Sequence, residues 1–323
     1  MAGRVPNAEC RVPSVKAKAT ELGFIACGVA DLGESRFGDA LDRWLSLGYA
    51  GTMRYLHRQA AKRKRPADIV PGATRAVVVL DNYYKASTRR GGRKPARASV
   101  KISRYARGRD YHLELGERLE RLAEYLRASG ATIARPFVDA GPVPERELAA
   151  RAGLGWIGKN TMLIRPGVGS FFFIGCVLTD LALAVDPPFE TDHCGSCTRC
   201  LEACPTNAFV APRVLDANRC ISYLTIEYRG DVPEELAAKL DGWAFGCDVC
   251  NEVCPWNERF AAPSEQAAYD DRKAIPRDDP TFFERLTEAE FADQFVDTPL
   301  ERPGLEGMRR NFRNAFASTR EKR

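Results

Sequence analysis

The chain has 323 residues, of which 45% are hydrophobic and 28% are charged, and its formal net charge is +5. This balance is that of an ordinary folded protein and excludes a disordered or fibrous chain. No basic and then apolar segment opens the sequence, and the longest apolar run, Phe171 to Leu178, is too short to span a bilayer. We therefore expect a cytoplasmic protein without a membrane anchor, built from two domains and a small third piece.

Helical and strand-like stretches alternate through the first 186 residues. Apolar residues that recur at intervals of three and four, as at Tyr111, Leu115 and Leu119, predict helices, and short valine-rich runs predict buried strands. The expected helices are Ser14–Gly23, Phe37–Leu47, Thr52–Lys64, Asp110–Ser129 and Glu145–Ala152, and the expected strands are Phe24–Ala30, Ala76–Leu80 and Thr132–Asp139. This alternation predicts an α/β domain over residues 1–186.

Two further strands, Thr161–Ile164 and Ser170–Thr179, are separated by turn residues and are predicted to pair as a hairpin. Pro187 and Pro188 mark the end of the first domain. We expect a ferredoxin-like, cysteine-rich domain over residues 187–260 and a short helical C-terminal segment over residues 261–323.

The cysteines have the most specific spacing in the chain. The run CGSCTRCLEACP, which begins at Cys194, has the spacing C-x2-C-x2-C-x3-C-P of bacterial ferredoxins with two clusters, in which the fourth cysteine ligates the other cluster. The run CDVCNEVCP lacks the first member of this pattern because Ala244 stands in its place, and Cys220 is the nearby cysteine that can replace it. The predicted [4Fe-4S] ligands are Cys194, Cys197, Cys200 and Cys254 for one cluster, and Cys204, Cys220, Cys247 and Cys250 for the other.

Thiolate sulfur suits iron–sulfur clusters, and two-residue gaps let the cysteines of one loop converge on one cluster. A pair of structural zinc sites is the alternative, because zinc also uses C-x2-C pairs. Disulfides are not expected, since eight cysteines are assigned to oxygen-sensitive clusters. Cys10, Cys27 and Cys176 remain, and we expect them to be buried side chains.

A glycine-rich segment, Gly153-Leu-Gly-Trp-Ile-Gly158, matches G-x-G-x-x-G, and with Lys159 it is similar to a phosphate loop. Neither interpretation fits its context. The glycines follow a predicted helix rather than a strand, and Asn160 stands where a phosphate loop has Ser or Thr. Close approach of this backbone to another flat or anionic ligand stays open.

Asp139 follows a predicted strand among apolar and glycine neighbours. Ligand crevices in α/β sheets lie at such strand ends, and an apolar setting raises the pKa of a carboxyl toward that of a general acid. The alternative from position alone is an aspartate that caps the next helix.

Basic side chains cluster at residues 58–65 (RQAAKRKR), at residues 89–97 (RRGGRKPAR), and at Arg309, Arg310 and Arg313. Such clusters can neutralise phosphates, so three of them favour a polyanionic partner. The alternative for each is a solvated helix face or loop. Trp156 and the run Phe171 to Phe173 could stack on nucleic-acid bases, or they could belong to the core.

Several stretches together resemble the epoxyqueuosine reductase family, which combines cobalamin with iron–sulfur clusters and completes queuosine synthesis in tRNA. Besides the cysteine run with CPTNA, they are SRYARGRDYH from Ser103, RPFVDAGPVPER from Arg135, AGLGWIGKN from Ala152, GSFFFIG from Gly169, RCISYLTIE from Arg219 and GCDVCNEVCPWN from Gly246. The resemblance covers roughly Val12 to Asn257 and continues loosely to Asn314.

The resemblance implies a cobalamin-binding α/β domain, a ferredoxin-like domain with two clusters, and reduction of an epoxide on the base at the tRNA wobble position. It implies that Asp139 is the proton donor. The cofactor contacts that it implies are Arg58, Ser103, Asp139, Gly158, Lys159, Asn160, Ser170, Phe171, Ser222, Phe245 and Gly246, with Thr225 as a substrate contact. The implied partners are a tRNA anticodon loop that carries epoxyqueuosine and a soluble electron donor such as a flavodoxin or ferredoxin, and we expect a monomer.

Many members of the family continue into a C-terminal helical-repeat extension that grips tRNA, whereas this chain stops soon after Ala317. Two other classes of protein fit parts of the sequence. An electron-transfer module would leave the ~190 residues ahead of the clusters unexplained. A corrinoid reductase of a small molecule, similar to reductive dehalogenases, is opposed by the basic clusters and by the lack of an export signal.

Overall fold

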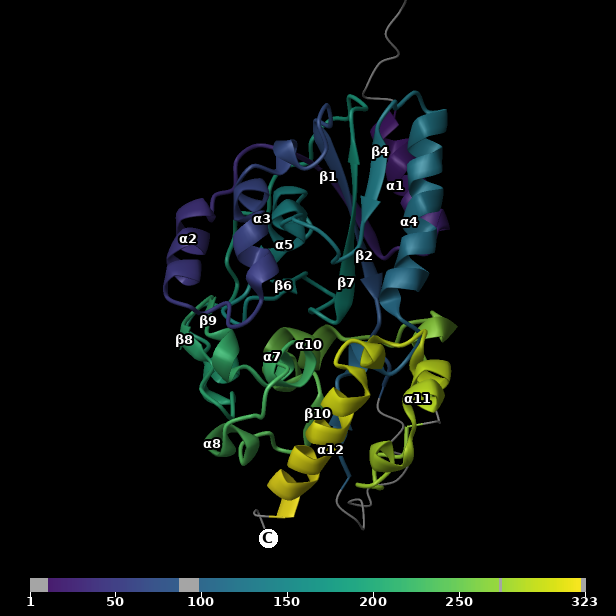
Figure 1. The fold of residues 1–323 in the computed structure, drawn as a ribbon. Coiled ribbons are helices and arrows are strands. Elements are labelled where there is room, and N and C mark those ends of the chain that lie inside the picture. Colours follow the sequence, from purple (N-terminus) through teal and green to yellow (C-terminus); the bar gives the residue numbers. More distant parts are fainter. Residues whose placement is uncertain (1–10, 87–98, 273–274, 321–323) are drawn as a thin grey trace, which may run out of the picture.

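The computed structural model describes residues 11–86, 99–272 and 275–320. The upper half of the molecule in Figure 1 contains a four-stranded sheet of order β1-β2-β7-β4, in which each neighbouring pair is antiparallel. Its strands are β1 (Ala26–Asp31), β2 (Arg75–Asn82), β7 (Phe172–Thr179) and β4 (Ala134–Phe137). The central strands β2 and β7 are continuous apolar runs because both faces of the sheet are covered.

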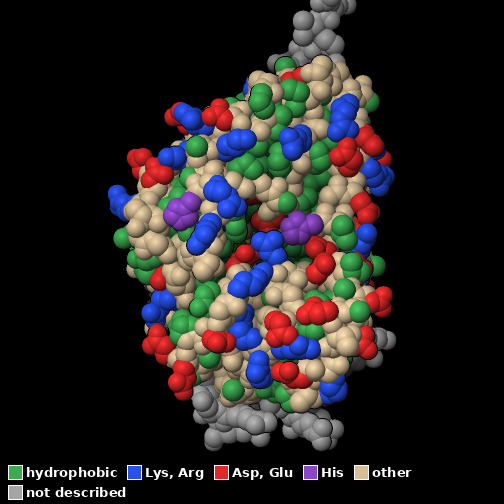
Figure 2. All heavy atoms as spheres, viewed as in Figure 1, with side chains coloured by type: hydrophobic (Ala, Val, Ile, Leu, Met, Phe, Trp, Pro, Cys, Tyr) green, Lys and Arg blue, Asp and Glu red, His purple; other side chains and the backbone are tan. Residues whose placement is uncertain are grey.

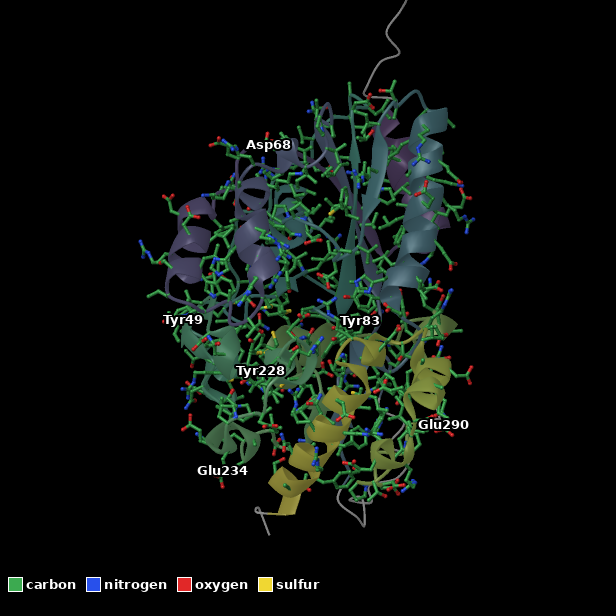
Figure 3. All side chains as sticks on the ribbon, viewed as in Figure 1. Tyr49, Asp68, Tyr83, Tyr228, Glu234 and Glu290 are labelled. Carbon is green, nitrogen blue, oxygen red and sulfur yellow. The ribbon has the colours of Figure 1, made fainter. Side chains whose placement is uncertain are left out.

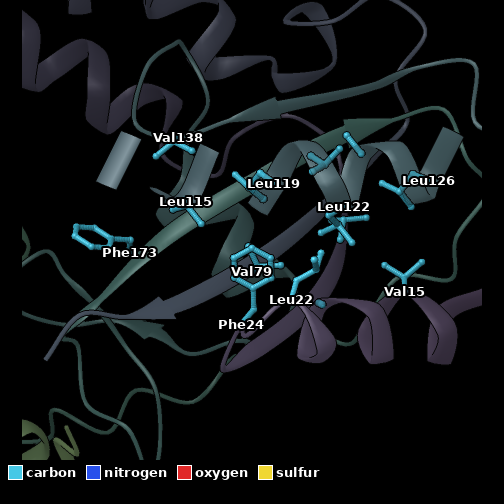
Figure 4. Close-up of a cluster of buried hydrophobic side chains, with 14 of the residues drawn as sticks. Val15, Leu22, Phe24, Val79, Leu115, Leu119, Leu122, Leu126, Val138 and Phe173 are labelled. Atoms are coloured by element: carbon cyan, nitrogen blue, oxygen red, sulfur yellow. The ribbon is translucent and has the colours of Figure 1, made fainter. Parts of the chain in front are cut away.

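Helices cover the two faces. On one face lie α1 (Arg11–Glu21) and α4 (Tyr111–Ala128), and the leucines of α4 form one apolar stripe toward the sheet, as Figure 4 shows. On the other face lies α5 (Glu145–Arg151), with α2 (Gly38–Ser46) and α3 (Arg54–Lys64) beyond it. Asp110 caps α4 by accepting a hydrogen bond from the backbone N–H of His112 at 2.8 Å, a contact worth about 1 kcal/mol.

The cysteine-rich part of the chain forms short elements below the sheet. The helices are α6 (Arg199–Glu202), α7 (Ile221–Ile226), α8 (Glu234–Ala237), α9 (Val249–Glu252) and α10 (Pro255–Phe260), and β8 (Phe209–Ala211) pairs with β9 (Val214–Leu215). Helices of four to six residues are marginal by themselves. Their arrangement must therefore be held by tertiary contacts and by whatever the cysteines bind.

A third core joins distant parts of the sequence. β10 (Trp243–Phe245) pairs in parallel with β3 (Lys101–Ile102), and both pack against α11 (Glu288–Phe295) and α12 (Gly304–Arg320). The chain around β3 thus lies in the lower half, although it belongs to the sequence range predicted for the first domain. Tyr83 lies where the two halves meet (Figure 3).

A buried polar network ties the C-terminal segment to the sheet. Asp81 on β2 is 1% exposed and accepts hydrogen bonds from Arg118 at 3.1 Å and from the hydroxyl of Tyr269 at 2.5 Å. Burial raises the pKa of Asp81, and the two donors oppose that rise. Removing either donor would leave a buried carboxylate with too few partners, which is costly.

Some local predictions differ from the structure. The first helix already includes Arg11, whereas it was predicted from Ser14. The predicted hairpin is wrong, because β6 (Leu163–Ile164) pairs with β5 (Trp156–Ile157) while β7 enters the main sheet. In the described ranges, no helix combines the length and the apolar character that crossing a membrane requires.

Candidate functional site

The seven cysteines of the two runs, together with Cys220, fall into two sets according to which thiol groups interact. Burial raises the pKa of Cys200, and the charges of Cys194, Cys254 and Cys197 raise it further. Burial also raises the pKa of Cys254, against backbone N–H groups that lower it, and Cys194 and Cys197 again contribute. The segments that carry these cysteines are also joined by a contact, because Arg199, next to Cys200, pairs with Glu258, four residues after Cys254, at 2.8 Å. The first set of neighbouring thiols is thus Cys194, Cys197, Cys200 and Cys254.

The second set consists of Cys204, Cys220, Cys247 and Cys250. Burial raises the pKa of Cys247, and the charges of Cys220 and Cys204 add to the rise. Burial raises the pKa of Cys250 as well, with contributions from Cys247, Cys220, Cys200 and Cys204. Because Cys200 of the first set acts on Cys250, the two sets are neighbours.

N–H groups are directed at several of these sulfur atoms. The backbone N–H of Ala208 donates to Cys204 Sγ at 3.3 Å, and the indole of Trp156 donates to Cys194 Sγ at 3.5 Å. Donors of this kind stabilise the negative charge of cluster-bound thiolates. The chemistry of the donor set fits two iron–sulfur clusters.

Two of the three remaining cysteines lie inside the sheet half. Cys176 on β7 is fully buried, and burial raises the pKa of Cys27 on β1 to about 12. Both are therefore neutral packing residues. Cys10 lies outside the described residues.

Asp139 lies in the loop that follows β4. Its backbone has φ 47°, in the left-handed region that strains residues other than glycine. The hydroxyl of Tyr111 donates a hydrogen bond to Asp139 Oδ2 at 2.6 Å, and the ring of Tyr111 stacks on Phe173 with centroids 4.3 Å apart. Asp139 is exposed, so the buried apolar setting expected from its neighbours is absent. It does not cap α5 either, because Pro144 occupies that position.

The opposite side of the same loop is held from α3. Arg63 donates to the carbonyl of Gly141 at 2.8 Å and to that of Val143 at 3.4 Å. Burial raises the pKa of Glu145, just beyond the loop, to about 7, and the charge of Asp139 contributes to the rise. Sequence reasoning missed this function of Arg63 and of Tyr111, because both belong to regular helical patterns that carry no sign of a loop contact.

Most polar side chains predicted to contact a cofactor are bonded to protein groups. The hydroxyl of Ser103 donates to the buried carboxylate of Asp248. Ser170 and Asn160 both bond to the Asn251 side chain, at 3.2 and 3.3 Å. These contacts connect the sheet half to the loops that carry Cys247, Cys250 and Cys254.

The remaining predicted contacts vary in exposure. Phe245 and Thr225 are fully buried, and the Thr225 hydroxyl accepts from the backbone N–H of Gly246 at 3.0 Å. Phe171 is 4% exposed and packs on Tyr84. Ser222 is partly buried, and Arg58 is exposed on α3.

The aromatic side chains that could have stacked on nucleic-acid bases are part of the core. Trp156 and Phe171, Phe172 and Phe173 are all at most 9% exposed. They are therefore not available to stack on a nucleic-acid base in this conformation.

The glycine-rich segment has its glycines for reasons of packing. Gly153 has φ 72°, and a Cβ there would lie 2.7 Å from the carbonyl oxygen of Pro187. A Cβ on Gly155 would lie 2.2 Å from the carbonyl oxygen of Ile164. Only glycine permits such approaches. The resulting turn directs the Lys159 ammonium to the carbonyls of Gly195 and Cys197, at 2.7 and 2.9 Å.

The predicted basic clusters differ in what they do. Arg310 is buried and donates to the carbonyls of Leu224, Tyr228 and Gly230, so it is structural. Arg309 likewise donates to the carbonyls of Phe283 and Leu286. The cluster at residues 89–97 lies outside the described residues.

The basic cluster at residues 58–65 lies on α3 and is partly on the surface. α3 exposes Arg54, Arg58 and Lys62, which recur at helical spacing and so share one face. Figure 2 shows Lys and Arg side chains gathered around a hollow between the two halves of the molecule.

The fold and the thiol sets define a redox protein with a double iron–sulfur domain, and comparison with known families agrees. Residues 193–257 match a family model described as a 4Fe-4S double cluster binding domain, and residues 63–140 match one described as "Epoxyqueuosine reductase QueG, DUF1730". A Pseudomonas aeruginosa protein named epoxyqueuosine reductase is 43% identical over 300 residues, which cover 93% of this chain and 83% of that protein. A Synechocystis protein of the same name is 41% identical and covers 88% and 98%.

Solved structures lead to the same family. A crystal structure of epoxyqueuosine reductase with an epoxyqueuosine-modified tRNA stem loop has a TM-score of 0.88 and 28% identity, covering 97% of this chain and 82% of that one. A reductive dehalogenase shares the fold, with a TM-score of 0.50 and 17% identity over 97% of this chain and 38% of that one. The chain belongs to the epoxyqueuosine reductase family, and it is thus an oxidoreductase with an iron–sulfur domain.

Proposed function

We propose that this chain reduces epoxyqueuosine to queuosine at the wobble position of tRNA, using electrons that a soluble donor delivers. The observation that carries the proposal is the position of Asp139 relative to the second thiol set. Tyr111, which donates to Asp139, has its ring centroid 6.0 Å from that of Tyr105. The Tyr105 ring in turn lies 3.4 Å from where a Cβ on Gly246, the neighbour of Cys247, would stand. An exposed carboxyl thus stands close to the place where electrons would arrive.

We assign one [4Fe-4S] cluster to Cys194, Cys197, Cys200 and Cys254, and the other to Cys204, Cys220, Cys247 and Cys250. The first set adjoins exposed residues such as Gly195 and Ser196, which favours it as the entry point for electrons. Cys250 of the second set acts on Tyr83, whose ring centroid lies 4.5 Å from that of Phe173, the residue on which Tyr111 stacks. This set is therefore connected to the side of the sheet half that carries Asp139. When bound, the clusters and a cobalamin supply the electrons and the reducing metal that the reaction needs.

The described residues also fit a cobalamin, which the family resemblance implies. Arg63 Nε and Arg104 Nε are buried nitrogen atoms that have no hydrogen-bond partner among the described residues. The amide side chains at the rim of a corrinoid are acceptors that such donors need. We propose that Arg63 and Arg104 hold this rim. The contacts expected from the family are proposed to complete the pocket, with the exception of Lys159, whose ammonium is bonded to the carbonyls of Gly195 and Cys197.

Asp139 is proposed to supply the proton when the epoxide opens. Converting the epoxide to an alkene consumes two electrons and two protons and releases the oxygen as water. An alkoxide is unfavourable in a site with little water, so a proton donor lowers the barrier. Tyr111 would orient the Asp139 carboxyl while Arg63 fixes the loop backbone. A related structure in which the loop of the catalytic aspartate is swung out of the active site supports a loop that moves.

The tRNA is proposed to lie against the exposed basic face of α3. Arg54, Arg58 and Lys62 are exposed there, and α3 also carries Arg63 to the Asp139 loop. Phosphate contacts of this kind position a nucleic acid without reading its sequence. The crystal structure of a family member with a modified tRNA stem loop supports this class of substrate.

The proposal is tested by incubating protein reconstituted with iron, sulfide and cobalamin with epoxyqueuosine-containing tRNA and a reductant, without air. Mass spectrometry of the nucleosides should then detect queuosine. Protein that holds both clusters and cobalamin but leaves epoxyqueuosine unchanged would contradict the proposal and favour an electron-transfer module.

A further inference from the structure

The glycine-rich segment of the sheet half reaches across to the first thiol set. Trp156 donates its indole N–H to Cys194 Sγ at 3.5 Å, and Lys159 places its ammonium 2.7 Å from the Gly195 carbonyl and 2.9 Å from the Cys197 carbonyl. We propose that Trp156 and Lys159 set the reduction potential of the cluster held by Cys194, Cys197, Cys200 and Cys254. This inference rests on the proposed cluster assignment.

The direction of the effect follows from charge. Reduction adds one negative charge to the cluster, part of which is carried by the thiolate sulfurs. A donor N–H on sulfur and a nearby cation therefore stabilise the reduced state more than the oxidised state, and both raise the potential. Trp156 and Lys159 act in the same direction, so they make this cluster a better acceptor for an incoming electron.

The surroundings of Trp156 strengthen its contribution. The indole is 4% exposed and packs against the rings of Phe189, His193 and Trp256, with centroids 5.7, 5.0 and 4.9 Å away. This packing fixes the orientation of the N–H and excludes water from one side of Cys194. Electrostatic interactions are stronger where water is excluded.

The charge of Lys159 is not offset by a neighbouring acid. In the part of the chain that the structure describes, its partners are backbone carbonyls, and no carboxylate forms an ion pair with it. Two other cations near this set each pair with an acid. Arg199 pairs with Glu258 at 2.8 Å, and Arg213 pairs with Asp192, which accepts a hydrogen bond from the backbone N–H of Cys194 at 2.8 Å. Because both pairs are close to neutral, Lys159 contributes a positive charge that no described carboxylate offsets.

The segment is held firmly enough to act as a fixed electrostatic element. The backbone N–H of Arg213 donates to the carbonyl of Lys159 at 2.9 Å, and Arg213 Nε donates to that of Ile157 at 3.0 Å. The adjacent Asn160 reaches Asn251 beside the second set. Since the segment begins behind α5, it connects the sheet half to both thiol sets.

The test is a redox titration of the reconstituted protein followed by electron paramagnetic resonance. Trp156→Phe keeps the aromatic packing and removes the N–H, while Lys159→Gln removes the charge and keeps a donor. We expect each to weaken reduction of one cluster by about tenfold, which for one electron is about 59 mV toward negative potential. The other cluster should keep its potential.

Three further variants make the result specific. Lys159→Arg keeps the positive charge and should restore a potential close to that of the unsubstituted protein. Trp44→Phe removes an indole N–H that donates to a backbone carbonyl, and Lys18→Gln removes a surface cation on α1, so neither should shift the first cluster.

The iron content of each protein shows whether a negative result contradicts the proposed effect on the reduction potential or the cluster assignment itself. Unchanged potentials in Trp156→Phe and Lys159→Gln proteins that hold about eight irons, the sum of two cubanes, would overturn the inference and leave the proposed function intact. Equal shifts of both clusters would overturn it too. If Lys159→Gln loses iron, Trp156→Phe decides the outcome. Unsubstituted protein that holds no iron would instead overturn the cluster assignment itself.

Discussion

The hydrogen bond between Tyr111 and Asp139 allows the proposed proton donor to be tested without removing it. Tyr111→Phe deletes the hydroxyl that donates to Asp139 Oδ2 at 2.6 Å and keeps the ring that stacks on Phe173. A proton donor reacts from its neutral form, and a hydrogen bond between neutral groups contributes about 0.5–1.5 kcal/mol. If its whole effect lies in orienting the carboxyl, the rate of epoxide reduction should fall by about 2- to 10-fold.

The assay is single-turnover conversion of epoxyqueuosine in tRNA by pre-reduced protein, with nucleosides quantified by mass spectrometry. We expect the rate constant at saturating tRNA to fall while the tRNA concentration for half-maximal rate stays constant, because Tyr111 acts on the reacting group. Tyr125→Phe, on the same helix but packed against the core of the sheet half, is the matched control and should react normally. An unchanged rate for Tyr111→Phe, with cofactors retained, would refute the orienting function of this hydroxyl.

Three other substitutions test separate parts of the account. Asp139→Asn should lower turnover by about 10²- to 10⁴-fold with iron and cobalamin content unchanged, and full turnover would exclude Asp139 as the proton donor. Glu145 has a folded-state pKa of about 7 instead of its ordinary 4.5, so its stabilising contribution is complete below pH 4.5 and is lost as pH rises through 7. Above pH 7, Glu145→Gln should therefore be more stable than the unsubstituted protein by up to about 3 kcal/mol, which should appear as a higher melting temperature. A difference in melting temperature between the two proteins that is the same at pH 5 and pH 8.5 would contradict this. Tyr269→Phe should destabilise the protein by about 1–3 kcal/mol because Asp81 loses a buried donor, and an unchanged thermal melt would show that the C-terminal segment is held by other contacts.

The features that sequence predicted well are local. The spacing C-x2-C-x2-C-x3-C-P belongs to one loop and one short helix, so it identifies a double cluster domain, which the family comparison confirms. The heptad-like leucines predicted α4 to within a residue at each end, and the family resemblance on short motifs was correct.

The features that sequence missed depend on partners far away in the chain. β7 was predicted to pair with its neighbour, but a strand that is apolar on both sides fits a central position whose partners lie distant in sequence. Arg310 was taken for a surface cation, whereas three carbonyls of one distant segment surround it. Lys159 was compared with a phosphate-binding lysine, but its actual partners lie 36 and 38 residues away.

The most direct test of the whole account measures how much queuosine the pre-reduced protein forms when no external electron donor is present. Protein with both clusters and cobalamin is reduced chemically, freed of reductant, and mixed with an excess of epoxyqueuosine-containing tRNA while cluster absorbance and nucleosides are followed together. Because the reduction takes two electrons, we predict about one queuosine for each chain, with oxidation of the clusters at the same rate. Clusters that stay reduced in the presence of this tRNA, or that become oxidised without forming queuosine, would contradict the account.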